Sequence, residues 1–483
     1  MTQTSQSDPI VVWLRDDLRL DDNPALAEAA DSGRPVVPLV VLDEESDGVR
    51  ILGGAHKWWL HHSLERFGRD LADKGAPLIL RRGKASEHVV DIVESTGATT
   101  LLMNRRYDQA SRAVDDAVEE ALGGGVEVQR FTANILHDPD KVRTKTGGWY
   151  KVYTPFWKNL AEHDPRDPID PPDKLAALED QPRSDRLEDW GLLPTRPDWS
   201  GGISAFWEVG EAAAHERFEE FCDEWLDDYP NGRDRPGDDA TSRMSPHLRW
   251  GEISPYRLWH TAEAYANRRK TIPGDALKTF KKELVWRDFN YHLLHNFGPL
   301  ATQNYNDRFD AFPWRSAKTE LRAWQKGLTG YPIVDAGMRQ LWECGWMHNR
   351  VRMIVGSFLT KDLLIDWREG ERWFWDTLVD GDIASNTAQW QWIGGSGADA
   401  QPYFRVFNPV TQSQRFDGDG DYIRRFVPEL ADLPDKALHA PWEADADTLA
   451  EARVELGETY PKPIVDHGTA RKRALDAYGD VKG

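Results

Sequence analysis

Short apolar runs alternate with amphipathic stretches over the first 135 residues, and this alternation constrains the fold more than any other feature of the sequence. The runs have the length and composition of buried strands, at Ile10–Leu14, Val36–Leu42, Pro77–Leu80, Thr100–Met103 and Val126–Phe131. Helical hydrophobic spacing separates them, at Pro24–Ala30, Lys57–Lys74, Ser86–Ser95 and Ser111–Leu122. Because strands that alternate with helices pair in parallel, we predict an α/β domain with a doubly wound parallel sheet over residues 1–138.

The rest of the chain has a different character. Residues 139–205 are predicted to be an interdomain linker, since Pro, Asp and Arg dominate His163–Asp198, which cannot hold a helix or a central strand. Beyond this linker strand signals are rare and helical spacing recurs, at Ala212–Leu226, Tyr256–Arg268, Ala276–Leu294, Leu321–Lys326, Val334–Glu343, Arg350–Asp362 and Glu371–Leu378. We therefore predict an all-α domain over residues 206–483.

Length and composition exclude several classes of protein. A chain of 483 residues is too long for one ordinary core, so several domains are expected. The first eight residues are polar, and no apolar run reaches the ~18 residues that a membrane span needs. Cys222 and Cys344 stand alone, without the spacing of a disulfide framework or of a metal site. These observations predict a cytoplasmic protein with no membrane partner and no metal.

Charge and aromatic content point in opposite directions. A formal net charge of −21 favours a small-molecule enzyme, because DNA phosphates require Lys and Arg. The chain nevertheless has 22 tryptophans, ten of them between Trp286 and Trp392, in a region that also holds basic residues. Core packing seldom needs so many indoles, since each brings a buried N–H that must be satisfied. Basic residues interleaved with aromatics indicate a surface that stacks bases or a flat cofactor.

Two short segments combine groups suited to a nucleotide or a base. Thr241-Ser-Arg-Met-Ser-Pro246 places three hydroxyls at a loop that enters a helix, where they could hold a phosphate or simply cap the helix. In Glu283-Leu-Val-Trp-Arg-Asp288, helical spacing puts Glu283, Trp286 and Arg287 on one face. A base-recognition surface and a structural Arg–Glu pair beside a core tryptophan both fit this second pattern.

Two further segments carry the densest chemistry of the sequence. In Trp346-Met-His-Asn-Arg-Val-Arg-Met353, helical spacing places Asn349, Arg352 and Met353 on one face and turns Arg350 aside. Asp380-Gly-Asp-Ile-Ala-Ser-Asn-Thr-Ala-Gln-Trp-Gln-Trp392 holds two carboxylates, an amide and two indoles within thirteen residues. A plain core does not require such a density of polar and aromatic groups.

These segments resemble the photolyase/cryptochrome family, and are most like its class I cyclobutane pyrimidine dimer photolyases. The resemblance begins at Val12-Trp-Leu-Arg-Asp-Asp-Leu-Arg-Leu20 and passes through Tyr150-Lys-Val-Tyr-Thr-Pro-Phe156. It is densest from Gly330-Tyr-Pro-Ile-Val-Asp-Ala336 to Tyr403-Phe-Arg-Val-Phe-Asn-Pro409. The family fold, an α/β antenna domain, a linker and a helical FAD-binding domain, agrees with the domains predicted above.

The resemblance implies FAD as cofactor and a set of residues that hold it. Tyr229 and the segment Thr241, Ser242, Arg243, Met244 and Ser245 would contact the cofactor, with the hydroxyls at its phosphates. Arg352 would pair with Asp380 beside the flavin ring, Asp382 would bind the flavin, and Asn386 would face its N5. Trp390, Trp367 and Trp314 match the tryptophans that relay electrons to the flavin.

The resemblance also implies the reaction and the DNA contacts. Glu283, Trp286, Asn349, Met353 and Trp392 would line a pocket for a flipped-out pyrimidine dimer, and Arg233, Arg350 and Arg405 would hold backbone phosphates. The implied activity is that of a deoxyribodipyrimidine photo-lyase, in which an electron from excited FADH⁻ splits cyclobutane pyrimidine dimers of UV-damaged DNA. Glu283, Asn386 and the three relay tryptophans are the expected catalytic residues.

Three other functions are weighed against a dimer photolyase, and the identity of a second chromophore is left open. A cryptochrome photoreceptor shares the fold, but plant-type photoreceptors tend to have Asp and insect ones Cys where this chain has Asn386, and no long tail follows the core. A (6-4) photolyase would be expected to have histidines in the pocket helix near Asn349 and Met353, and this sequence has neither of them. A flavin-binding module without light chemistry would not need the relay tryptophans. A second, antenna chromophore is expected, either a folate or an 8-hydroxy-5-deazaflavin, and the simplest assembly is a monomer.

Overall fold

The computed structural model describes residues 8–269, 271–399 and 404–482. Tyr403, which opens one of the motifs quoted above, lies outside these residues. The chain forms two compact units, one of Met1–Asp227 with Ser242–Pro299 and the other of Asp228–Thr241 with Leu300–Gly483. The functional boundaries predicted near residues 138 and 205 stay a prediction.

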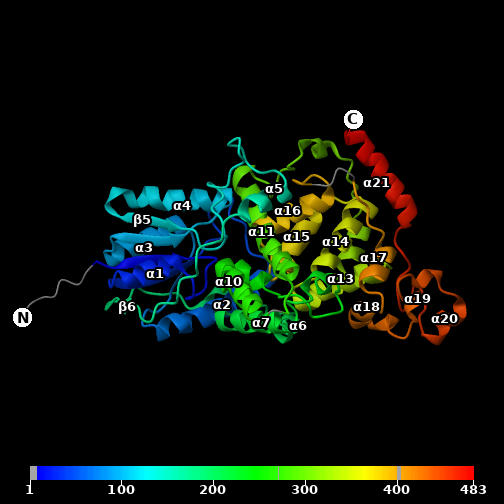
Figure 1. Ribbon diagram of the computed structural model, residues 1–483, viewed down its shortest axis with the longest axis horizontal. Helices are drawn as coiled ribbons and strands as arrows, with labels where there is room; N and C mark the ends of the chain where they lie inside the picture. The colour runs from blue at the N-terminus through cyan, green and yellow to red at the C-terminus, as the bar shows by residue number, and fades with distance from the viewer. Residues whose placement is uncertain (1–7, 270, 400–403, 483) are drawn as a thin grey trace, which may run out of the picture. The chain divides into compact units, whose positions relative to one another are not determined.

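The first unit contains the predicted parallel sheet, which confirms the α/β class (Figure 1). Its strands are β1 (Ile10–Leu14), β2 (Pro35–Leu42), β3 (Ile79–Arg82), β4 (Thr100–Asn104) and β5 (Glu127–Phe131). They lie in the order β3-β2-β1-β4-β5, and every pairing between them is parallel. The first strand of the sequence is therefore the central strand of the sheet.

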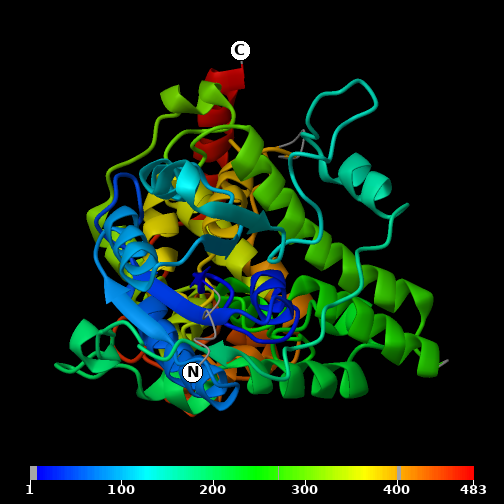
Figure 2. The ribbon, with the colours of Figure 1, turned by 90° about the vertical axis from the view of Figure 1, so that its left-hand side faces the viewer.

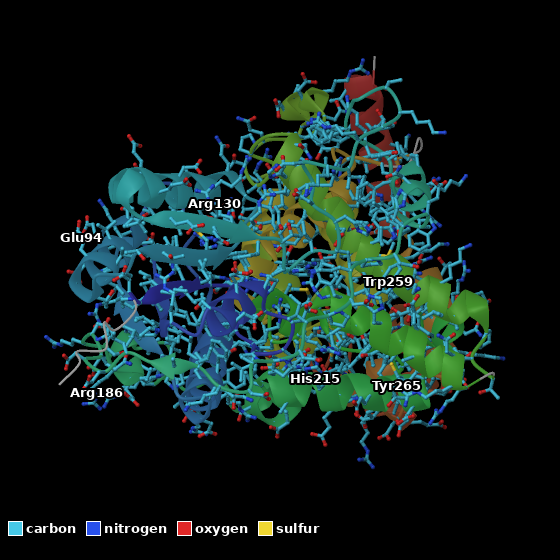
Figure 3. The ribbon with its side chains drawn as sticks, turned by 60° about the vertical axis from the view of Figure 1, so that its left-hand side comes forward. Glu94, Arg130, Arg186, His215, Trp259 and Tyr265 are labelled. Atoms are coloured by element: carbon cyan, nitrogen blue, oxygen red, sulfur yellow. The ribbon has the colours of Figure 1, made fainter. Side chains whose placement is uncertain are left out.

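Helices cover both faces of this sheet (Figure 2). They are α1 (Pro24–Asp31), α2 (Gly54–Asp73), α3 (Ala85–Thr96) and α4 (Gln109–Leu122). Alternate residues of β1, Val11 and Trp13, join a core cluster with Val89 of α3 and Val114 of α4. The helix α1 packs against β1 and β4. The edge strand β5 is anchored by Arg130, which pairs with two acidic residues of α4 (Figure 3).

The predicted linker contains more structure than its composition suggested. Within residues 139–205 lie α5 (Tyr153–Leu160), a 3₁₀ helix (Leu187–Trp190) and most of α6 (Gly201–Phe206). The expectation that His163–Asp198 holds no helix is thus wrong for one short 3₁₀ turn. A two-residue strand, β6 (Ala176–Ala177), also pairs with the start of β2. Pairing is possible there because β3 contacts only the second half of β2, from Leu39 onward.

Helices make up the remainder of the first unit, namely α7 (Glu211–Glu224), α9 (Ser245–Trp250), α10 (Pro255–Arg268) and α11 (Gly274–Asn296). The long helix α11 packs on α10 and on α5. Lys281 of α11 lies 4.1 Å from the ring centroid of Trp259 on α10, which is labelled in Figure 3. Such a contact between a cation and an aromatic face fastens the two helices together.

Helices connected by loops, with no extended strand, make up the described part of the second unit, as predicted. Its helices are α8 (Tyr229–Gly232), α12 (Lys318–Gln325), α13 (Pro332–Cys344), α14 (Asn349–Ser357), α15 (Trp367–Thr377), α16 (Ile383–Gly394), α17 (Pro409–Phe416), α18 (Asp421–Phe426), α19 (Asp435–Leu438), α20 (Ala446–Glu451) and α21 (His467–Lys482). Short 3₁₀ turns lie at Asp307–Ala311, Pro428–Leu430 and Pro441–Glu443. The single helix predicted over Arg350–Asp362 instead changes to a π-helix at Phe358–Asp362. Among the described residues no helix is long and apolar enough to cross a membrane.

Candidate cofactor and DNA site

A cavity of about 190 Å³ opens between α14, α15 and α16 in the second unit. Eight of the predicted site residues line it: Asn349, Arg352, Met353, Asp380, Asp382, Asn386, Trp390 and Trp392. Phe374 and Leu378 of the α15 segment add apolar wall. Residues predicted to hold the flavin and residues predicted to hold the lesion thus share one cavity.

Arg352 and Asp380 form the predicted ion pair on the wall of this cavity. The guanidinium donates two hydrogen bonds to the carboxylate, at 3.2 and 2.8 Å, and its Nε donates to the carbonyl of Met347 at 2.7 Å. The Asp380 side chain is only 2% exposed. A two-pronged contact of this kind fixes both side chains in one orientation. The pair therefore presents an ordered, polar edge to any ring that enters the cavity.

Asn386 is held by a neighbour that sequence reasoning did not identify. Its Nδ2 donates to the Glu371 carboxylate at 2.8 Å and to the Glu371 carbonyl at 3.1 Å. Because only the amide nitrogen can donate to a carboxylate, these contacts fix which end of the amide is which. The oxygen Oδ1 is then the atom that Asn386 can offer to the cavity, as an acceptor for a ring N–H.

Asp382 has a structural role in addition to its predicted one. It is the N-cap residue of α16, and its carboxylate accepts a hydrogen bond from the backbone N–H of Ser385 at 2.7 Å. Such a cap stabilises the start of a helix by about 1 kcal/mol. Since α16 carries Asn386 and Trp390, the cap also helps to fix the positions of these two side chains in the cavity wall.

The start of α14 follows the predicted division of faces. Asn349, Arg352 and Met353 line the cavity, whereas Arg350 turns away and pairs with Asp234 at 2.7 Å. The helix is capped by His348, whose Nδ1 faces the Arg350 N–H at 3.2 Å. Burial lowers the pKa of His348 to about 3, so its imidazole stays neutral and can accept this hydrogen bond.

The three relay tryptophans lie at different depths in the same unit. Trp390 lines the cavity and is 4% exposed, and Trp367 is fully buried, with its indole N–H donating to Asn304 at 2.9 Å. Trp314 is partly exposed. Helices α15 and α16, which carry Trp367 and Trp390, pack directly on each other. The two inner tryptophans of the predicted relay are therefore buried, and Trp314 is the most exposed of the three.

Four other predicted residues of the second unit do not line this cavity. Tyr229 is buried at the start of α8, and the Arg233 guanidinium lies 5.6 Å from its ring centroid. Thr241 is partly buried, and Arg405 is exposed, 5.0 Å from the ring of Phe407. The roles predicted for these four residues stay predictions.

The hydroxyl loop crosses from one unit to the other between Thr241 and Ser242. It enters the short helix α9 at Ser245, as predicted, and Met244 is buried before it. Arg243 has φ of 55°, a conformation that is unfavourable for a residue with a Cβ. Its guanidinium lies 4.3 Å from the ring of Phe206. Strain of this kind is often found at ligand-binding loops.

Glu283 and Trp286 belong to the first unit, on α11, and are described there alone. Trp286 stacks on Tyr153 of α5, with ring centroids 3.6 Å apart and planes 7° apart. Arg287 does not form the alternative Arg–Glu pair with Glu283 among the described ion pairs, because its guanidinium donates to the carbonyls of Asn134 and Leu248. Tyr153, a residue of the same unit, therefore covers one face of the Trp286 indole.

Sequence reasoning missed the residues that support the site. Glu371 and Asn304 hold Asn386 and Trp367, and Gly370 lies so close to Trp390 that a Cβ there would be 2.5 Å from Cζ3 of the indole. Each supporting residue lies at least 15 residues from its partner along the chain. A helical or strand pattern relates only near neighbours, so no periodicity could have found them.

The lining fits part of a planar heteroaromatic cofactor. It combines flat apolar walls with a few oriented polar groups, as small-molecule sites do. Its volume is below the range of about 300–1,000 Å³ typical of such sites, so the cavity can take the ring portion of a dinucleotide but not the whole. Arg352, Asp380 and Asn386 are the residues that could hold that ring.

Comparison with known proteins identifies the family. Residues 10–174 match the DNA photolyase family, and residues 280–480 match the FAD binding domain of DNA photolyase. A deoxyribodipyrimidine photo-lyase of Agrobacterium fabrum is 53% identical over 476 residues, covering 98% of both chains. The chain belongs to the photolyase/cryptochrome family and carries its FAD-binding domain.

Solved structures agree with this assignment. A bacterial class III photolyase from Agrobacterium tumefaciens matches with a TM-score of 0.95 and 51% identity, covering 100% of both chains. A cryptochrome of Synechocystis sp. PCC6803 matches with a TM-score of 0.86 and 28% identity, covering 97% of this chain and 99% of that one. The family and the fold are confirmed, whereas the class I subgroup is not, since so similar a structure is a class III photolyase.

Proposed function

We propose that the protein is a deoxyribodipyrimidine photo-lyase that repairs cyclobutane pyrimidine dimers in UV-damaged DNA under blue light. One observation carries the proposal: the predicted flavin residues Arg352, Asp380 and Asn386 line the same cavity as the predicted lesion residues Asn349, Met353 and Trp392. Electron transfer from a cofactor to a lesion needs the two in close proximity. The names of the similar proteins support the same activity.

The residues of the chain would bind, orient and shield the reacting groups. When bound, reduced FAD would supply, after light absorption, the electron that splits the dimer. Arg352 and Asp380 would orient the ring, and the Asn386 oxygen would accept its N–H. Trp392 and Met353 offer an apolar wall that excludes water. Glu283 and Trp286 are proposed as further lesion contacts on the strength of the resemblance.

The dimer must leave the helical stack to reach any such cavity, and flipping costs a few kcal/mol, less at a damaged site. Arg233, Arg350 and Arg405 are proposed to hold the backbone phosphates around it. With a net charge of −21, binding must depend on a restricted set of cations. The relay Trp390, Trp367 and Trp314 is proposed to return electrons to oxidised flavin, inward from the surface.

The first experiment uses an oligonucleotide with one thymine dimer, incubated with the reduced protein in blue light and in darkness. Recovery of thymine absorbance in the light alone is expected. Asn349→Ala should slow recovery by at least about tenfold, a change of about 1.4 kcal/mol in barrier. Trp342→Phe, at a 60% exposed tryptophan outside the cavity lining, is the control and should leave repair unchanged.

A cryptochrome-type photoreceptor is the second candidate, favoured by the similarity to the Synechocystis cryptochrome. Bound flavin with photoreduction but no repair of either dimers or (6-4) photoproducts would replace the first proposal with this one. Photoreduction itself tests the relay: Trp314→Phe should bind FAD normally and lose photoreduction.

We also propose a second chromophore, either a folate or an 8-hydroxy-5-deazaflavin. The two have different absorption and mass, so extraction from purified protein followed by mass spectrometry distinguishes them. Extraction of FAD alone would contradict this part of the proposal.

A further inference from the structure

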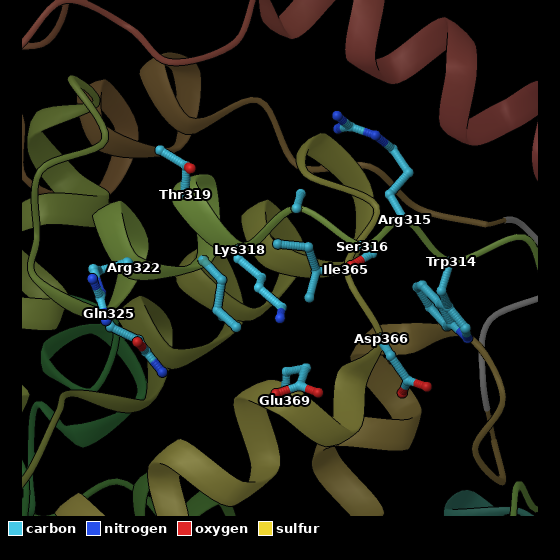
Figure 4. Close-up of a pocket in the computed structure, with 12 residues that line it drawn as sticks. Trp314, Arg315, Ser316, Lys318, Thr319, Arg322, Gln325, Ile365, Asp366 and Glu369 are labelled. Atoms are coloured by element: carbon cyan, nitrogen blue, oxygen red, sulfur yellow. The ribbon is translucent and has the colours of Figure 1, made fainter.

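A second, larger cavity adjoins the outer end of the relay. It has a volume of about 790 Å³ and is lined by Trp314, Arg315, Ser316, Ala317, Lys318, Thr319, Leu321, Arg322, Gln325, Ile365, Asp366 and Glu369. All of these residues belong to the second unit. Figure 4 shows Lys318 extending toward Glu369, with Trp314 and Asp366 on one side and Arg322 and Gln325 on the other. We call this cavity the Trp314 pocket.

The carboxylates of the Trp314 pocket are already neutralised by arginines outside its lining. Asp366 pairs with Arg368 at 3.3 Å and also caps α15, where it accepts the backbone N–H of Arg368 at 2.9 Å. Glu369 pairs with Arg372 one turn further along the same helix. Neither acid therefore presents an unopposed negative charge to the pocket.

The cations of the pocket are not balanced in the same way. Arg315 lies 3.5 Å from Glu320 and donates to the carbonyl of Leu363 at 3.1 Å. Lys318 and Arg322 have no ion-pair or hydrogen-bond partner for their side chains among the described residues. The pocket therefore has an excess of two positive charges beside an aromatic ring. Such a hollow attracts anions and raises their local concentration.

Electron conservation makes a donor at Trp314 necessary, if the relay operates as proposed. Each electron that moves inward through Trp367 leaves Trp314 one electron short, as an indole radical cation. Unless an outside donor reduces the Trp314 radical cation, the transferred electron returns from the flavin to Trp314, and no net reduction of the flavin occurs. The donor must reach the one relay tryptophan that is partly exposed, which is the one that lines this pocket.

We propose that the Trp314 pocket binds a small anionic one-electron reductant that reduces the Trp314 radical cation. The donor gives one electron to the indole, which regains its closed shell with its N–H in place, and the donor leaves as its one-electron-oxidised radical. No atom is transferred and no bond of the protein breaks. Lys318 and Arg322 hold the negative charge of the donor, and the volume accommodates a molecule of drug size. The inference rests on the proposed relay.

The test follows the Trp314 radical after a light flash, with ascorbate, an anion at neutral pH, as the donor. Binding predicts that the decay rate saturates as ascorbate is added. In the double variant Lys318→Glu with Arg322→Glu, the rate at low ascorbate should fall by about tenfold, since reversed charge repels the donor. Hydroquinone, an uncharged donor, should react at the same rate with both proteins. A salt concentration of about 0.15 M limits long-range effects.

Lys326→Glu provides the matched control. Lys326 is exposed at the end of the same helix α12 but does not line the pocket, so this variant should behave as the wild type. Calorimetric titration with ascorbate in the dark gives an independent readout, and binding should be lost only in the double variant.

The outcomes separate this inference from the proposed function. A wild-type rate that rises linearly with ascorbate and is unchanged in the double variant would overturn the pocket while leaving the relay intact. Equal slowing with ascorbate and hydroquinone would also overturn it, because a charge effect cannot act on a neutral donor. If the wild type forms no Trp314 radical, both the relay and the inference fail.

Discussion

The inner cavity and the Trp314 pocket lie in the same helical unit but treat their polar groups in opposite ways. In the inner cavity, Arg352 is matched to Asp380, and the Asn386 amide nitrogen is matched to Glu371. In the Trp314 pocket, Lys318 and Arg322 lack partners among the described side chains. Supported groups of fixed orientation suit a resident cofactor, whereas exposed, unmatched charge suits a molecule that arrives and leaves.

The comparison predicts that the inner cavity is sensitive to its supports. Glu371→Ala removes the carboxylate, one of the two Glu371 acceptors that hold Asn386, and leaves a hole in a buried site, since Glu371 is 3% exposed. We expect the free energy of unfolding to fall by about 3 kcal/mol and FAD retention to weaken. Denaturant unfolding and the flavin-to-protein absorbance ratio measure the two effects. Glu371→Gln keeps an acceptor oxygen and should lose much less; equal losses would show that the hydrogen bond is not what matters.

A second support is steric. In Gly370→Ala, the new Cβ would lie 2.5 Å from Cζ3 of Trp390 and 2.6 Å from Leu359, so one of them must move. Overpacking of this kind should cost about 2 kcal/mol and shift the flavin absorption bands. Gly479→Ala, in helix α21 with open space around the site, is the control and should be neutral or slightly stabilising. A stable Gly370→Ala protein with an unchanged spectrum would contradict the close fit.

Acid should lower the free energy of unfolding through His348, which caps the helix α14 at the inner cavity. The pKa of His348 is lowered to about 3, chiefly by burial and also by Arg350, Arg352 and Arg233, while Asp234 opposes the shift. The unfolded chain binds a proton near pH 6.5, so the contribution of His348 to stability is complete above pH 6.5 and is lost as the pH falls toward 3. The loss is about 1.4 kcal/mol per pH unit.

His348→Asn should flatten this pH dependence, because Asn is also a favourable N-cap residue but does not titrate. Unfolding free energies at pH 7, 6 and 5 give the slopes of the two proteins. Because other buried histidines titrate too, the slope should decrease without vanishing. Identical slopes for the wild type and His348→Asn would show that His348 does not contribute to the pH dependence of stability.

The smallest effect is expected at the Trp314 pocket. Lys318→Glu and Arg322→Glu change exposed side chains without partners, so the melting temperature should shift by less than about 2 °C. Thermal unfolding monitored by circular dichroism measures the shift. A large drop would mean that these cations stabilise the fold and would remove the contrast between the two sites.

Periodicity predicted the sheet more accurately than the helix boundaries. Ile10–Leu14 was predicted with its observed bounds, because a buried parallel strand is a continuous apolar run. Helix α4 was predicted to begin at Ser111 but begins at Gln109, because the Asp108 carboxylate caps it by accepting the Ser111 N–H. The cap residue was visible in the sequence. The change to a π-helix at Phe358–Asp362 has no counterpart in the hydrophobic spacing of the sequence.

For the site, helical spacing alone placed Asn349, Arg352 and Met353 on one face, and the structure bears this out. The pairing of Arg352 with Asp380 came from the family resemblance, since 28 residues separate them. Neither helical spacing nor the family resemblance predicted Glu371. Its partnership with Asn386 exists only because α15 and α16 pack side by side, which is a property of the fold and not of any local pattern.

The central position of β1 also bears on how the chain is made. This strand leaves the ribosome before the other strands of the sheet, yet it borders both β2 and β4, so one of its edges stays unpaired until Asn104 has been synthesised. At about 5–20 residues per second, several seconds pass in which a wholly apolar nascent segment, Ile10–Leu14, has an open edge. Because an open apolar strand edge is a template for pairing with other chains, we expect the nascent chain to be most prone to aggregation before the fourth strand emerges.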